Sequence, residues 1–146
     1  MWFSRKQGAG SGNKDATAST KRLGDVAEDQ ALAHLQAHGL RLVQRNFRTP
    51  GRGGGEIDLI MREPDATLVF VEVRQRASSA QGGAGASVTA HKQRRIVWAA
   101  RHFLLNLGSE PACRFDVVLI QGSASPAQAP PSIEWIRAAF DTDGHF

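Results

Sequence analysis

The sequence predicts a single α/β domain, a mixed central β-sheet flanked by helices, on the basis of three observations. Two segments place apolar residues three and four positions apart, which is the spacing of an amphipathic helix. Five shorter segments are dense in Val, Ile, Leu and Phe, as strands are. The 146 residues are enough for one hydrophobic core and too few for two. The predicted order of elements is α-β-β-β-α-β-β.

Both predicted helices have recognisable ends. Residues 1–19 are poor in apolar side chains, so we expect a disordered N-terminal tail before the first helix. Thr20 is the candidate N-cap of that helix, and Gly39 ends it. The second helix is predicted over residues 88–107, with Gly108 after its last turn. Its inward-facing residues are expected to be Ile96, Ala99, Ala100, Phe103, Leu104 and Leu107.

The predicted strands are separated by segments rich in Gly, Pro, Ser and Ala. They cover residues 40–47, 56–61, 67–73, 114–120 and 132–136. Residues 49–55 form a glycine-rich loop, and the small, polar residues 77–87 are expected to form a mobile loop. All elements belong to one domain over residues 20–140, followed by a frayed C-terminal tail over residues 141–146.

Composition narrows the functional classes. The formal net charge is +4 and the pI is about 10, which favours an anionic partner and nucleic acid first. Cys113 is the single cysteine, so the sequence encodes neither a disulfide framework nor a cysteine-based zinc site. We find no secretory signal and no apolar run near the ~20 residues that span a bilayer. We therefore expect a soluble, cytoplasmic protein with no membrane partner.

The stretch GEIDLIMREPDATLVFVEVRQR, residues 55–76, places acidic residues inside a predicted strand pair. If the hairpin is centred on Asp65, residues equally distant from Asp65 lie opposite each other. The predicted pairs are Asp58 with Glu72, Glu56 with Arg74, and Ile60 with Phe70. This register predicts one face that carries the charges and one that carries Val, Leu and Met for the core.

Asp58 opposite Glu72 is destabilising unless another group compensates the two charges, because cross-strand Cβ atoms lie only ~4.5–5.5 Å apart. A hard divalent ion resolves this repulsion, and Mg²⁺ binds one or two carboxylates together with phosphate oxygens. Arg74 is expected to project into the same site, where it binds phosphate or orients a water. On pattern alone, a solvated sheet face with Glu56 paired to Arg74 explains the charges as well.

The second helix begins with the basic run HKQRR, residues 91–95. Cations at a helix N-terminus oppose its dipole at ~0.3–1 kcal/mol each, so phosphate binding explains the run better than helix stability does. Lys92 lies four residues before Ile96, on the side that turns toward the sheet. Arg94 and Arg95 are candidate phosphate contacts, with a merely polar helix face as the equal alternative. Arg76 is a further candidate nucleic-acid contact.

At these residues the sequence resembles known nucleases. Asp58 followed by Glu72-Val73-Arg74 resembles the signature of the PD-(D/E)XK superfamily. The segments GEIDLI, VFVEVR, KQRRI and RFDVV together resemble the small bacterial YraN family of uncharacterised endonuclease-like proteins, over about residues 20–138. That family is itself similar to archaeal Holliday-junction resolvases. The resemblance implies a restriction-endonuclease-like core.

The resemblance also implies roles for individual residues. Asp58 and Glu72 would bind Mg²⁺ or Mn²⁺, with the backbone carbonyl of Val73 as a third ligand. Glu28, on the first helix, matches an acidic residue that resolvase-like members place near the metal; without the resemblance it reads as surface. Lys92 matches a helical lysine that helps to position the scissile phosphate.

Three functional hypotheses follow from the sequence. The first is a divalent-metal-dependent phosphodiesterase acting on DNA rather than RNA, branched or single-stranded. Arg74 stands where the superfamily has lysine, so the second is a non-catalytic nucleic-acid-binding accessory that retains the nuclease fold. The third is a protein-interaction module with a structural acidic face. A homodimer is a further expectation, because junctions are two-fold and resolvases act as dimers, although the sequence marks no interface.

Overall fold

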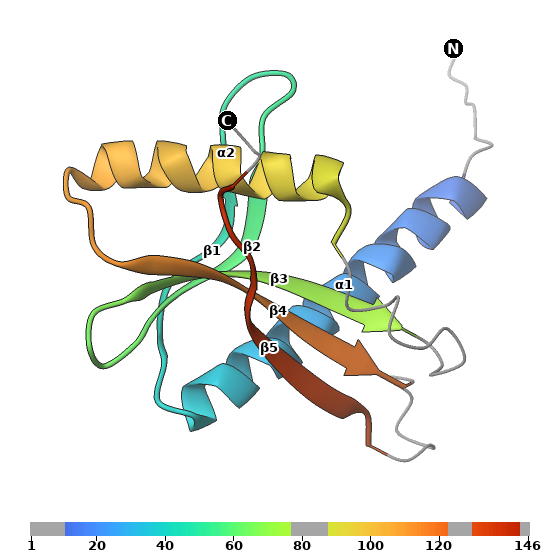
Figure 1. The fold of residues 1–146 in the computed structure, drawn as a ribbon. Helices are drawn as coiled ribbons and strands as arrows, with labels where there is room; N and C mark the ends of the chain where they lie inside the picture. Colours follow the sequence, from blue (N-terminus) through green and yellow to red (C-terminus); the bar gives the residue numbers. More distant parts are fainter. Residues whose placement is uncertain (1–10, 77–87, 123–129, 144–146) are drawn as a thin grey trace, which may run out of the picture.

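The computed structural model describes residues 11–76, 88–122 and 130–143, with side chains from Gly24 onward. It contains two helices and five strands in these ranges (Figure 1). In chain order they are α1 (Ser11–Ala37), β1 (Arg41–Arg48), β2 (Glu56–Arg62), β3 (Leu68–Arg76), α2 (Ala90–Leu107), β4 (Cys113–Gln121) and β5 (Ser132–Phe140). The predicted order of elements is confirmed. The loop predicted over residues 77–87 lies outside the described residues.

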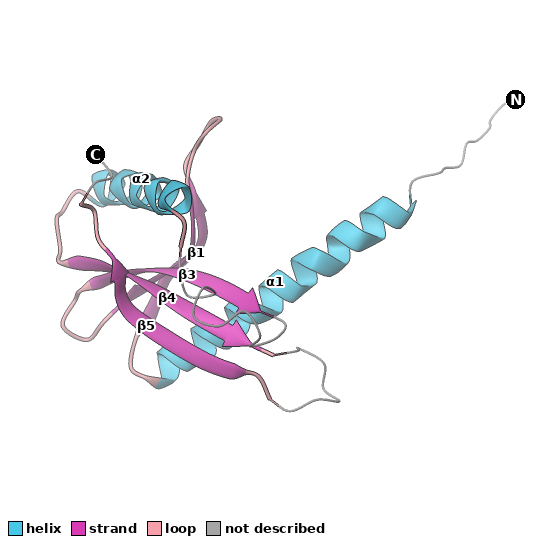
Figure 2. Cartoon of the chain, turned by 45° about the vertical axis from the view of Figure 1, so that its right-hand side comes forward, coloured by secondary structure: helices cyan, strands magenta, loops and turns pink. Residues whose placement is uncertain are grey.

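The five strands form one mixed sheet in the order β1-β2-β3-β4-β5. Every neighbouring pair is antiparallel except β3 and β4, which are parallel and are connected through α2. Figures 1 and 2 show α2 over one face of the sheet and α1 across the other. This arrangement is consistent with a restriction-endonuclease-like core and confirms the predicted fold class.

Each helix covers its own hydrophobic cluster. Beneath α2 lie Ile57, Ile60 and Phe70 with apolar residues of the helix itself. Beneath α1 lie Leu59 and Met61, among others. The expected division of the β2–β3 pair into a charged face and an apolar face is therefore wrong. Both faces are apolar because a helix packs on each, and the alternation within one hairpin carries no information about that second helix.

The first helix begins earlier than predicted. It starts at Ser11, so the expected start at Thr20 is wrong, and residues 11–19 are helical instead of belonging to a disordered tail. This segment contains no proline, and the helix extends through it beyond the turns that pack on the sheet, although most of its residues have low helix propensity. Residues 1–10 lie outside the described residues.

The second helix is close to its prediction. Thr89 caps it by accepting a hydrogen bond from the N–H of Lys92, and Gly108 ends it with a φ of 76°, a left-handed conformation that glycine adopts easily. Ile96, Ala99 and Ala100 are buried as expected. Leu107 is 39% exposed, so its predicted place in the core is wrong, because the helix ends beyond the part that the sheet covers.

Candidate functional site

Asp58 and Glu72 lie where β2 and β3 separate. The predicted register is confirmed near the turn by the pair Ile60–Phe70, but Leu59–Val71 is the last pair between these strands. The predicted cross-strand pairs of Asp58 with Glu72 and of Glu56 with Arg74 are therefore wrong, because β2 and β3 separate before they reach these residues. One residue further on, the backbone N–H of Val73 donates to Asp58 Oδ2 at 2.8 Å. Meanwhile β3 stays paired with β4, and Glu72 lies beside Val117. The two acids therefore lie at the point where the sheet opens.

Burial makes these acids weak. Glu72 is 7% exposed, and Asp58 is half-buried. Burial, followed by the negative charge of Glu72, raises the pKa of Asp58 to about 7, against the stabilising N–H of Val73. Burial also raises the pKa of Glu72, although Lys92 opposes this. The two carboxyl groups therefore disfavour each other's ionisation.

Lys92 reaches the acids from the first turn of α2. Its Nζ lies 3.4 Å from Glu72 Oε1, so the prediction that this side chain turns toward the sheet is confirmed. The ammonium is half-exposed, whereas the carboxylate is nearly buried. Because water screens the exposed partner, the single ion pair offsets only part of the charge of the two carboxyl groups.

Glu28 joins the acids from α1. It lines the same hollow of about 250 Å³ as Asp58 and Glu72, and its side chain is 14% exposed. Burial and then the charge of Asp58 raise the pKa of Glu28. Arg45 of β1 lies 3.5 Å from Glu28 and 2.9 Å from Asp29. The alternative that Glu28 is an ordinary surface acid is thus wrong.

Sequence reasoning missed Arg45. Nothing in the sequence of β1 distinguishes this arginine from Arg41 or Arg48, and only the packing of β1 against α1 brings it to Glu28. The next residue, Asn46, nevertheless gave a signal in the sequence that the backbone departs from a regular strand at this point. Asn46 has a φ of 52°, a left-handed conformation that asparagine tolerates better than most residues, and it hydrogen-bonds Glu28.

The acids do not form a closed cage. Among the described residues, no three His, Cys, Asp or Glu side chains gather at metal-ligand spacing, so Glu28 stands apart from the pair. Two carboxylates beside the carbonyl of Val73 nevertheless suit Mg²⁺ or Mn²⁺. Such ions take few protein ligands and keep waters and phosphate oxygens, whereas zinc takes three or four protein ligands. The donor set therefore fits the expected class of metal.

The predicted phosphate-binding arginines divide into two groups. Arg74 and Arg76 line a second hollow of about 550 Å³ together with Glu72 and Lys92. Arg95 instead donates to the carbonyl of Gly54 at 3.0 and 3.2 Å. Arg94 is exposed on α2, and neither Arg94 nor Arg95 lines the two hollows beside the acids.

The glycine-rich loop packs against α2. A Cβ at Gly55 would overlap the carbonyl oxygen of Arg95, and a Cβ at Gly54 would overlap the hydroxyl of Thr49. That hydroxyl accepts a hydrogen bond from the N–H of Gly55 at 2.7 Å. Glu56, at the end of the loop, lies 3.5 Å from Arg48. Gly54 and Gly55 are therefore explained by close internal packing.

Asp116 has a structural role. It is fully buried, and it accepts hydrogen bonds from Trp135 Nε1 and from the N–H of Ala138, both at 2.9 Å. Arg114 donates to both of its carboxylate oxygens. These bonds fasten β5 where its register with β4 shifts.

Fold and site together define an α/β protein with an acidic centre at the opening of a restriction-endonuclease-like sheet. Residues 27–120 match the uncharacterised protein family UPF0102, and the chain belongs to this family, which confirms the YraN resemblance. A UPF0102 protein of Polaromonas naphthalenivorans is 56% identical over 151 residues, covering 97% of this chain and 99% of the relative. One of Paracidovorax citrulli is 59% identical over 141 residues, covering 97% and 98%.

A third UPF0102 protein, from Verminephrobacter eiseniae, is 62% identical over 125 residues, covering 86% of this chain and 81% of the relative. The relatives carry only the family designation, so the activity must be argued from the site. Neither helix in the described ranges combines the length and the apolar character required to cross a membrane.

Proposed function

We propose that this chain is a divalent-metal-dependent phosphodiesterase that hydrolyses DNA, with branched or single-stranded DNA as its substrate. The observation that carries the proposal is the pair of acids Asp58 and Glu72, both buried enough to have raised pKa values and faced by one half-exposed lysine. The resemblance to Holliday-junction resolvases supports DNA over RNA.

The charge of the acidic hollow argues for a cation. Asp58, Glu72 and Glu28 line one small hollow, and the pKa of each is raised first by burial. A purely structural sheet opening would be more stable with apolar residues there, because unpaired buried acids cost several kcal/mol. A divalent ion provides the compensation that Lys92 gives only in part.

Asp58, Glu72 and the carbonyl of Val73 would hold this ion, with Glu28 reaching it through water. When bound, Mg²⁺ or Mn²⁺ acidifies a coordinated water and stabilises negative charge on a phosphodiester. The N–H of Val73 keeps Asp58 Oδ2 at 2.8 Å, which fixes one carboxylate before any ligand arrives. Such preorganisation lowers the cost of assembling the site.

Arg74, Arg76 and Lys92 would hold the substrate. All three line the hollow of about 550 Å³ that adjoins Glu72. Arginine remains protonated and presents a planar fork of donors, so Arg74 suits phosphate binding and cannot act as a base. Lys92 supplies the compact ammonium that Arg74 does not, at 3.4 Å from Glu72. This position of Lys92 favours hydrolysis over the alternative of a non-catalytic nucleic-acid-binding accessory.

The test is cleavage of labelled linear, single-stranded and four-way-junction DNA with Mg²⁺, Mn²⁺ or EDTA. We expect metal-dependent cleavage by the wild type and none by Asp58→Asn or Glu72→Gln, which preserve side-chain size. Glu134→Gln removes an exposed acid on β5 and is the matched control, expected to cleave normally. If no substrate is cleaved while salt-sensitive DNA binding persists, the accessory hypothesis replaces the enzyme.

A further inference from the structure

The outer side of α2 carries cations and an exposed aromatic ring but no acid. The helix sequence AHKQRRIVWAARHFLLNL contains no Asp or Glu. Exposed side chains recur every three or four residues, so they lie along one side of the helix. We call this surface the α2 stripe, and it consists of His91, Arg94, Arg95, Trp98, Arg101 and Leu105.

Trp98 is the most unusual member of the stripe. Its side chain is 49% exposed, and its ring meets the ring of His102 edge-on at a centroid distance of 4.9 Å. Leu105 lies about two turns after Trp98 on the same helix and is 78% exposed. Exposed apolar side chains that cluster on a rigid helix mark a binding surface, because water gives them no favourable contacts.

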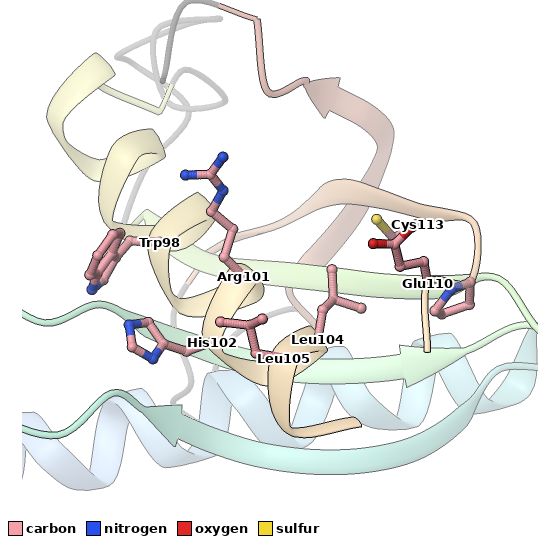
Figure 3. A pocket seen from close by; sticks show the side chains of 8 residues that line it. Trp98, Arg101, His102, Leu104, Leu105, Glu110 and Cys113 are labelled. Carbon is pink, nitrogen blue, oxygen red and sulfur yellow. The ribbon is translucent and has the colours of Figure 1, made fainter. Parts of the chain in front are cut away.

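An apolar hollow adjoins Trp98. Its volume is about 680 Å³, which is within the ~300–1,000 Å³ range of small-molecule pockets. Figure 3 shows Trp98 and His102 on one side of this hollow, Cys113 and Glu110 on the other, and Leu104 and Leu105 between them. A planar, largely apolar group held beside an indole ring suits such a surface.

The charges on the stripe decide what kind of partner it fits. A second copy of this chain packed through the same surface would bring Arg94, Arg95 and Arg101 against their own counterparts, with no acid on either helix. A nucleic acid offers phosphates for the arginines and flat bases for the tryptophan. Bases are available for stacking only where they are unpaired, since a duplex hides their faces.

We propose that the α2 stripe binds an unpaired segment of nucleic acid. Trp98 stacks on a base, the adjoining hollow receives a base, and Arg94 contacts the phosphate backbone. The proposal rests on the proposed function and specifies its substrate as a nucleic acid with a single-stranded segment. Trp98 lies six residues after Lys92, about 9 Å along the helix axis at 1.5 Å per residue. The two side chains also lie about 120° apart around the helix at 3.6 residues per turn, so a strand that reaches both has to cross from the outer side of α2 to its N-terminal end.

The test measures binding in EDTA, so that no cleavage occurs. Anisotropy of a labelled single-stranded oligonucleotide and of the duplex of the same sequence gives Kd at one fixed salt concentration. We expect tighter binding of the single strand by the wild type. Trp98→Ala should weaken it about 5- to 150-fold, the usual range for losing one base–aromatic stack, while Trp98→Phe should keep most of the affinity.

Matched variants separate stacking from charge. Arg94→Ala should weaken binding of single strand and duplex alike and reduce the salt dependence of Kd. Arg41→Ala removes an exposed arginine of the edge strand β1 and should leave binding unchanged. The thermal midpoint of every variant is measured alongside, and it should match that of the wild type because these side chains are exposed.

Three results would overturn the inference. The first is that Trp98→Ala binds the single strand as tightly as the wild type does. The second is that the wild type binds neither nucleic acid. The third is that Trp98→Ala changes the sedimentation of the protein without changing its binding. The last result would assign the surface to self-association. Failure of the proposed function is seen separately, because binding is measured in EDTA and cleavage with Mg²⁺ or Mn²⁺: a wild type that binds the single strand through Trp98 but cleaves no DNA would contradict the proposed function and leave this inference standing.

Discussion

Within the described ranges, the protein stabilises two buried acidic groups in opposite ways. Asp116 is fully buried, yet Arg114, Trp135 and Ala138 provide donors for its carboxylate. Asp58 and Glu72 are also withdrawn from water, but their pKa values are raised and the ion pair that faces them is half-exposed. A buried acid whose oxygens are satisfied by the protein holds the fold together. The charge of Asp58 and Glu72 is offset only in part by Lys92, and this difference is what the following predictions test.

The largest expected effect comes from Asp116→Ala. Removing this carboxylate leaves the indole N–H of Trp135, the N–H of Ala138 and part of the Arg114 guanidinium without their partner. We expect the free energy of unfolding to fall by about 3–5 kcal/mol, as measured by urea denaturation. A loss below about 1 kcal/mol would mean that water replaces the carboxylate and that the two acidic groups do not differ as described.

The second effect is stabilisation by metal. A divalent ion that binds the folded chain alone raises its stability by RT ln(1 + [L]/Kd), about 2.7 kcal/mol at a concentration of 100 Kd. Thermal unfolding with increasing Mg²⁺ or Mn²⁺ should therefore show a rising Tm in the wild type. Asp58→Asn and Glu72→Gln should lose the rise, whereas Glu134→Gln should keep it. A rise of equal size in all four proteins would place the ion elsewhere.

The smallest effect is a pH dependence in EDTA. Because the pKa of Asp58 is about 7 in the folded chain, folding retains a proton that the unfolded chain releases near pH 4. The free energy of unfolding should therefore fall as pH rises from about 4 to 7 and then level off. Asp58→Asn should lack part of this slope. At pH 8 it should be about 1–2 kcal/mol more stable than the wild type, because each pKa unit corresponds to about 1.4 kcal/mol and the partial exposure of Asp58 reduces the effect.

Urea denaturation at a series of pH values measures this difference. The side-chain amide oxygen that Asp58→Asn introduces can still accept the hydrogen bond from the N–H of Val73, so the substitution removes charge and little else. If Asp58→Asn is less stable than the wild type at pH 8 in EDTA, then Asp58 behaves like Asp116 and the contrast between the two acidic groups is wrong.

The approach of Asp58 to Glu72 was predictable from sequence, because the turn at Asp65 sets which residues of the two strands face each other. Asp65 centres the hairpin, and the turn is fixed by its carboxylate accepting from the N–H of Thr67, so the register of Ile60 with Phe70 follows. Lys92 was predictable in the same way, because helical spacing places it above the core residue Ile96.

The remaining features depend on contacts between distant segments. The end of pairing at Leu59–Val71, the cover of both sheet faces and the approach of Arg45 to Glu28 all arise when helices pack on the sheet. Local sequence patterns record which side of an element is apolar, but they do not record which element covers it. Trp98 was not among the predicted site residues, because its position on the outer side of α2 does not by itself distinguish a binding residue from an ordinary exposed one.

The separation of β2 from β3 has a mechanical consequence. Had the ladder continued, Asp58 and Glu72 would be cross-strand neighbours with Cβ atoms fixed about 4.5–5.5 Å apart. Instead β1 holds β2 on both sides of Asp58, and β4 holds β3 beside Glu72, so the two carboxylates belong to separately anchored strands. The hydrogen bond from the N–H of Val73 to Asp58 bridges the opening between these strands. A substitution that loosens one of the two strands would therefore displace one carboxylate without directly displacing the other.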